Sequence, residues 1–68
     1  MKTIKINQDY ITLQQLLKLE SFISSGGQAK YFLIENDVYV NDELEKRRGR
    51  KLFIDDTINI NDNLFIIK

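Results

Sequence analysis

Residues 25–42 read SGGQAKYFLIENDVYVND, and their pattern predicts a helix that leads directly into a β-hairpin. Ala29, Phe32 and Leu33 recur at i, i+3 and i+4, which is the spacing of an apolar stripe on one face of a helix over residues 27–35. The serine and glycines before the stripe suit a turn that begins this helix. The stripe needs a partner surface, and the flanking segments supply one.

The hairpin follows where helical spacing changes to alternation. Asn36 can end the helix in the left-handed conformation, which Asn tolerates better than most residues. Val38 and Val40 then alternate with polar residues, as a half-buried strand requires. The Asn-Asp pair at 41–42 suits a two-residue primed turn, after which residues 43–45 form the returning strand.

The flanking segments extend this unit into an α+β fold. Thr12 and Gln15 have the spacing of a capping box at the start of a leucine-rich helix over residues 13–20. Phe22 and Ile23, in the connection between the helices, are expected to contact the core. Further strands, separated by turns rich in Asp and Asn, are expected at residues 3–6, 51–54, 57–60 and 64–68.

Composition limits the possible functions. The 68 residues suit one small domain, residues 1–68, without room for a deep substrate cavity. The absence of Cys and His removes the usual ligands of structural zinc, the thiol nucleophile and the side chain that most often moves protons near neutral pH. We therefore expect no metal site, no cofactor and no catalytic residue. The alternating N-terminus is neither a secretory apolar region nor a membrane span, which favours a cytoplasmic location.

Charge is concentrated in one place although the formal net charge is zero. Residues 46–51, KRRGRK, contain half of the ten basic side chains. Arginine engages phosphate oxygens bidentately, so this run can bind a polyanion. It can equally be a solvated loop balanced by the acidic residues before it, and charge alone does not decide between the two. We expect its three arginines to act in binding only, so that their replacement by glutamine leaves the thermal transition nearly unchanged.

Other side chains can extend such a site. Lys30 flanks the apolar stripe near the start of the second predicted helix, where the SGGQ turn also offers backbone N–H groups to an anion. The helix start and the arginines can then face one groove. Tyr31 and Tyr39 can stack on bases, although half-buried packing is the commoner role of tyrosine.

The order of these residues resembles the RNA-binding domain of the ribosomal protein S-four type, in which a helix carrying Ala and a basic residue leads into a V-x-V-N-G hairpin. The matching positions are Ala29, Lys30, Phe32, Leu33, Val38, Val40 and Asn41. ITLQQLLKL is similar to the first helix of that domain, and RRGRKLFIDDTINI to its closing strands, so the resemblance spans about residues 12–60. The SGGQAK and RRGRKL pieces are most similar to the short stand-alone bacterial members, the YaaA type.

The resemblance implies two short packed helices against a small, bent antiparallel sheet of about five strands. It also implies a structured RNA ligand, ribosomal or transfer RNA, and a role in ribosome assembly or association, with the large ribosomal subunit as a partner. The implied RNA-binding residues are Lys30, Arg47, Arg48, Arg50 and Lys51, with Lys18, Gly27 and Gln28 as weaker candidates. Asn36, Asp42 and Asp55 stand where the family commonly has glycine, and all three keep turn chemistry.

Two other classes of function remain open. A small ubiquitin-like or acidic-partner-binding module could use a sheet edge or the basic run to bind a protein. Sulfur-carrier chemistry needs a terminal Gly-Gly, whereas the pair here is at 26–27 and the sequence ends in LFIIK. An enzyme would need acid–base groups that converge in a pocket, and the carboxylates here lie mostly at predicted turns.

Overall fold

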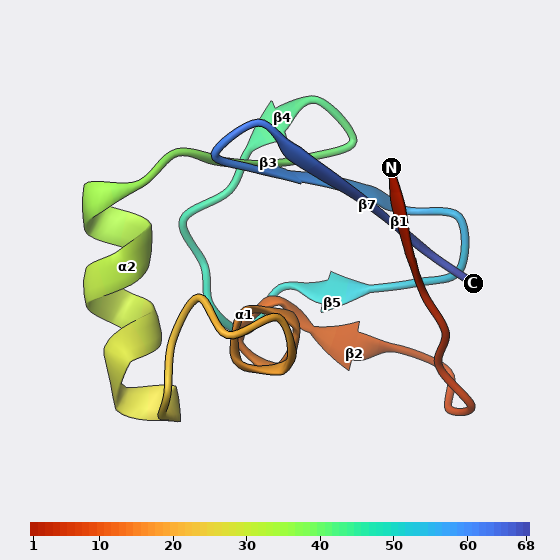
Figure 1. The fold of residues 1–68 in the computed structure, drawn as a ribbon, viewed down its shortest axis with the longest axis horizontal. Helices are drawn as coiled ribbons and strands as arrows, with labels where there is room; N and C mark the ends of the chain where they lie inside the picture. The colour runs from red at the N-terminus through yellow and green to blue at the C-terminus, as the bar shows by residue number, and fades with distance from the viewer.

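The computed structural model describes all 68 residues and arranges them as two layers with a helix at their side (Figure 1). One layer is a five-stranded sheet, the other consists of α1 and a two-stranded sheet, and α2 stands beside both. In chain order the elements are β1 (Lys2–Ile4), β2 (Ile11–Thr12), α1 (Leu13–Leu19), a 3-10 helix (Gly26–Gln28), α2 (Ala29–Glu35), β3 (Val38–Val40), β4 (Glu43–Leu44), β5 (Lys51–Leu52), β6 (Thr57–Ile60) and β7 (Asn63–Ile67). The predicted α+β class is confirmed, and neither seven-residue α-helix is long enough to cross a membrane.

The larger sheet has the strand order β1-β7-β6-β3-β4. Its strands are antiparallel neighbours except for β1, which runs parallel to β7 with Lys2 opposite Phe65 and Ile4 opposite Ile67. The sheet is therefore mixed rather than purely antiparallel. Parallel neighbours need a long connection, here nearly the whole chain, and a local sequence pattern does not reveal such a pairing.

The core fills the space between the two layers. The predicted leucine face of α1 is buried, except that Leu19 points to solvent. Phe22 reaches the core as predicted, with its ring centroid 5.6 Å from that of Phe32 and 6.1 Å from that of Phe65. The fifteen buried apolar residues are Ile4, Ile11, Leu13, Leu16, Leu17, Ile23, Ala29, Leu33, Val38, Val40, Leu52, Ile58, Ile60, Phe65 and Ile67.

Both ends of α1 are stabilised by local hydrogen bonds. The backbone N–H of Gln15 donates to Thr12 Oγ1 at 3.2 Å, and the N–H of Thr12 donates to Gln15 Oε1 at 2.7 Å, which confirms the predicted capping box. At the other end Ser21 has a φ of 64°, and the N–H groups of Ser21 and Phe22 donate back to carbonyls of the last turn. This Schellman arrangement ends the helix and directs Phe22 toward the core.

The prediction of a left-handed Asn36 is wrong. Asn36 follows α2 with a φ of −128° and a ψ of 140°, which is extended backbone. Because β3 begins only two residues later, the chain must leave the helix extended rather than turn back. Asn36 still ends the helix, since its backbone N–H and its Nδ2 both donate to Phe32 O, at 2.8 and 2.9 Å.

Two turns of the same sequence join neighbouring strands of the large sheet. Asn41 and Asp42 have φ values of 50° and 68°, and Asn61 and Asp62 have φ values of 50° and 67°. Positive φ at both central residues is the mark of a type I′ turn, so the predicted primed hairpin is confirmed. Asp55 also has a positive φ, of 75°. Asp42 and Asp55 thus adopt the backbone conformation that glycine favours.

The two-stranded sheet of β2 and β5 was not predicted. Ile11 pairs with Leu52, and Thr12 with Lys51, in antiparallel register. A two-residue strand is too short to show alternation, which explains why β2 has no sequence signal. The predicted strand 51–54 is shortened to Lys51–Leu52, because Phe53 and Asp56 bond to each other across a turn.

We expect Asp62→Gly to stabilise the protein, because glycine takes the observed positive φ without the steric cost of a β-carbon. The gain should be about 0.5 kcal/mol, or about 2–4 °C in Tm, measured by circular dichroism during heating. Glu43→Gly, in the exposed strand β4, is the control and should lower Tm. A lower Tm for Asp62→Gly would mean that the Asp62 side chain contributes more than its backbone conformation costs.

Candidate nucleic-acid interface

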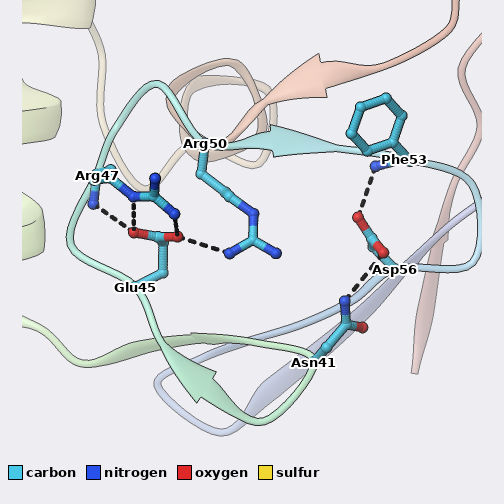
Figure 2. Close-up of polar contacts among 6 residues, drawn as sticks. All are labelled: Asn41, Glu45, Arg47, Arg50, Phe53 and Asp56. Carbon is cyan, nitrogen blue, oxygen red and sulfur yellow. Dashed lines mark hydrogen bonds and ion pairs between the residues drawn. The ribbon is translucent and has the colours of Figure 1, made fainter.

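Residues 45–50, which we call the arginine loop, connect β4 to β5 and fold around one carboxylate (Figure 2). Glu45 Oε2 accepts from the backbone N–H and the Nε of Arg47, both at 3.0 Å, and Glu45 Oε1 accepts from Arg47 Nη2 at 2.9 Å. Arg50 Nη1 donates to Glu45 Oε1 at 2.8 Å. The Glu45 side chain is only 6% exposed, whereas that of Arg47 is 75% exposed. A buried acid thus holds two arginines in fixed positions.

The ion pairs determine the protonation state of this acid. The hydrogen bond from the Arg47 guanidinium lowers the pKa of Glu45 from 4.5 to about 2, with a further contribution from Arg50, while burial acts in the opposite direction. Glu45 is therefore ionised over the physiological range. An ionised carboxylate with so little exposure would be strongly destabilising without such partners.

The backbone of the arginine loop also caps α1. The N–H of Leu13 donates to Arg50 O at 2.8 Å, and the N–H of Gln14 donates to Arg48 O at 2.9 Å. These are the first two N–H groups of α1, which have no acceptor within the helix. The arginine loop is therefore held in place by the ion pairs of Glu45 and by its backbone hydrogen bonds to α1. A freely solvated loop would lack both.

The cations of the basic run have different environments. Arg48 is exposed, and its side chain makes no ion pair or hydrogen bond within the protein. Lys46 turns the other way, toward the end of α2, where its Nζ donates to Leu33 O at 2.6 Å, to Asn36 O at 3.1 Å and to Asp37 at 3.2 Å. Lys46 therefore neutralises the carbonyl end of α2 and is not free for a ligand.

These contacts revise the expected role of the arginines. Arg47 and Arg50 neutralise a buried carboxylate, so their replacement should lower stability as well as remove positive charge. The sequence analysis did not predict that Glu45 positions these arginines. The sequence does place an acid directly before the basic run, but ion pairs at i+2 and i+5 in a loop have no periodic pattern that would predict them.

The two segments that the sequence singled out meet at the first turn of α1. The backbone of Gln14 bonds to the arginine loop, and its side chain lies against Gly26. A β-carbon at Gly26 would lie 2.5 Å from Gln14 Nε2, so a larger residue there would require the end of the flexible Gln14 side chain to move. Gly27 and Lys30 follow on the adjoining turns and are exposed, and Lys30 has no ion pair within the protein.

Lys18 and Gln28 lie in a separate hollow with Ser21 and Ser24. Gln28 Oε1 accepts from the N–H of Ser24 at 2.6 Å and from that of Ser25 at 3.3 Å, so this side chain closes the turn before α2. Lys18 is in the last turn of α1, whereas the arginine loop contacts the first. The structure therefore does not bring these two candidates together with the arginines.

A second, open hollow lies beside the arginine loop. It is lined by Arg47, Gly49, Arg50, Lys51 and Phe53. Three of these residues are cationic and none is acidic. Arg47 and Arg50 also pair with Glu45, so the three cations and this carboxylate leave a positive net charge that suits an anion. No group of three or more Asp, Glu, His or Cys side chains is placed to hold a metal ion.

Comparison with known proteins assigns this fold to a family. Residues 4–68 match the family model of the S4 domain, so the chain belongs to the S4 domain family of RNA-binding domains, as the sequence resemblance indicated. A relative from Bacillus subtilis (strain 168), named probable ribosome maturation protein RlbA, is 54% identical over 57 residues, which cover 84% of this chain and 80% of the relative. No solved structure was found to match. Neither the family nor the name of the relative indicates a catalytic activity.

We expect Glu45→Gln to remove one component of the pH dependence of stability. A carboxyl whose pKa is lower in the folded state stabilises the protein above its unfolded pKa, and this contribution is lost as the pH falls from about 4.5 to about 2. Because each pKa unit is about 1.4 kcal/mol and solvent around Arg47 screens the pair, the difference should be on the order of 2 kcal/mol. Urea unfolding over a pH series measures it.

Glu43→Gln, at an exposed position on β4, is the matched control for this measurement. It should follow the wild-type pH dependence. Equal pH dependence of wild type and Glu45→Gln would contradict a stabilising role for the buried ion pairs.

Proposed function

We propose that this protein binds structured RNA, specifically ribosomal RNA, through phosphate contacts from the arginine loop and the adjoining start of α2, and that it acts in ribosome maturation. The observation that carries the proposal is the arginine loop itself, whose backbone is bonded to α1 while the Arg48 side chain remains unpaired. Family membership supports the RNA class of ligand. The name of the Bacillus relative supports ribosome maturation as the cellular process. Association with the large ribosomal subunit is part of the proposal and is the setting that the experiment below tests.

Local charge favours a polyanion at this surface. Within residues 45–51, Lys46 is set aside because it pairs with Asp37 and the end of α2. The other four cations and one carboxylate leave a formal local charge of +3. The chain as a whole is neutral. Attraction is then restricted to one face, which favours a defined RNA site over general adhesion to polyanions.

The mechanism is electrostatic capture by a rigid surface. Arginine side chains contact phosphate oxygens, counterions are released from the RNA, and affinity falls as salt rises. Because the arginine loop is already held by Glu45 and α1, little conformational entropy is lost when it meets the RNA. Double-stranded RNA is recognised mainly by its backbone geometry, so a fixed set of cations selects for shape. No bond is made or broken.

Co-sedimentation tests the proposal directly. Purified protein should sediment with large ribosomal subunits at low salt, remain in the supernatant at high salt, and be released by ribonuclease. Release by salt but not by ribonuclease would indicate a protein partner in place of RNA.

We expect Arg48→Gln to weaken binding to ribosomal RNA and to reduce the magnitude of the log–log salt slope by about 0.7–0.9, the value for one neutralised phosphate. Filter binding across a salt series measures both quantities. The thermal transition should not change, because the Arg48 side chain makes no contact that stabilises the fold.

Lys5→Gln removes the same charge from an exposed position after β1 and serves as the matched control. It should keep the wild-type affinity and slope. If both variants behave alike, the arginine loop is not the phosphate-binding surface.

A further inference from the structure

The small sheet of β2 and β5 has two unlike faces. Ile11 and Leu52 lie opposite each other and are buried, so they form the inner face. Because side chains alternate along a strand, Thr12 and Lys51 belong to the outer face. Tyr10 and Phe53 continue this face, with ring centroids 5.8 Å apart and an angle of 50° between the ring planes.

Both aromatic rings are accessible to a ligand. Tyr10 is 37% exposed and Phe53 is 47% exposed, whereas Phe65 is buried and Phe22 and Phe32 are partly buried. A single exposed aromatic residue is unremarkable. Here two of them lie side by side on the outer face of a sheet, next to the most basic segment of the chain.

Cationic residues line the hollow to which Phe53 contributes. Lys51 Nζ lies 4.9 Å from the centroid of the Tyr10 ring, so it occupies one face of that ring by a cation–π contact. Phe53 shares the open hollow described above with Arg50 and Lys51. The ring of Phe53 is therefore more accessible to a ligand than that of Tyr10, and it lies at the edge of a hollow lined by cations.

Hydrogen bonds fix the backbone that carries Phe53. Its N–H donates to Asp56 Oδ2 at 2.8 Å, and Asp56 Oδ1 accepts from Asn41 Nδ2 at 3.0 Å (Figure 2). Asn41 lies in the type I′ turn between β3 and β4, so the hairpin turn and Phe53 are linked through one carboxylate. A surface that is held in place in this way loses little entropy on binding.

A ligand that suits this surface needs a flat apolar face and an adjacent negative charge. A nucleotide has both, since its base can stack on Phe53 while its phosphate contacts Arg50 or Lys51. Aromatic side chains on an exposed sheet face bind unstacked bases in this manner, and a base inside a duplex cannot reach them. We propose that the outer face of β2 and β5 binds an unpaired base of the RNA, with Phe53 as the stacking surface. This inference rests on the proposed function and adds the class of nucleotide that the site selects.

Ultraviolet cross-linking of the wild-type protein to ribosomal RNA at low salt is the first test, because it needs no variant. Mass spectrometry of the digested complex should place nucleotide adducts on the peptide that contains Phe53 or on the one that contains Tyr10. Adducts confined to other parts of the chain, such as the α2 peptide with Tyr31, would overturn the stacking site and leave RNA binding intact.

Two substitutions at one position provide the second test. Phe53→Leu keeps an apolar side chain and removes the aromatic face, so affinity for ribosomal RNA should fall by about five- to a hundredfold, the effect of one stacked base. Its salt slope should stay at the wild-type value, because no phosphate contact is lost. Phe53→Trp should retain or raise affinity. Leu64→Ala, which shortens an exposed apolar side chain on β7 outside the proposed interface, is the control and should bind as wild type does.

The outcomes separate this inference from the proposed function. Equal affinity of Phe53→Leu and wild type, with equal thermal transitions, overturns the stacking site, while the salt dependence of Arg48→Gln still reports on phosphate binding. Absence of any salt-sensitive binding of the wild type to ribosomal RNA overturns both. A third outcome is co-sedimentation with ribosomal subunits that persists after ribonuclease treatment and is lost in Phe53→Leu. It would assign this face to a protein partner and would also overturn the base-binding site.

Discussion

The ionised carboxylate of Glu45 is the constraint on which the arrangement of the basic surface depends. A charge with so little exposure must be paired and hydrogen-bonded, and Arg47 and Arg50 meet this requirement with four hydrogen bonds. Their geometry curls the arginine loop over the acid. The carbonyl groups of Arg48 and Arg50 then face the unsatisfied N–H groups at the start of α1. One buried acid thus connects the position of the basic side chains to the packing of the first helix.

Three of the five cations in residues 46–51 stabilise the fold. Lys46 completes the end of α2, and Arg47 and Arg50 neutralise Glu45, whereas the side chain of Arg48 has no partner within the fold. A neutral chain can therefore present a strongly basic surface without the repulsion that would open it. The proposed aromatic site on β2 and β5 adds a contact that charge cannot supply, because phosphate contacts alone do not distinguish paired from unpaired nucleotides.

Much of the fold was readable from local pattern. The Thr12 capping box, the buried stripe of α2 and the Asn-Asp turns each rest on interactions within a few residues, and each was confirmed. Two of the differences concern distant partners, since β2 exists only because β5 pairs with it, and β1 is parallel because β7 returns from the far end of the chain. Asn36 is the exception, because its extended backbone follows from the strand that begins two residues later.

The α+β class, the helix boundaries, the hairpin turns and the family follow from the amino-acid sequence, because they depend on periodicity, capping and residue order. Which basic side chains are free follows from the folded arrangement, because it depends on where each one finds an acceptor. Glu45 pairs with Arg47 and Arg50 through a loop conformation that has no periodic pattern, and Lys46 reaches the end of α2 because the fold places the two side by side. The pairing of Tyr10 with Phe53 is of the same kind, since residues 43 positions apart become neighbours only through the register of β2 and β5.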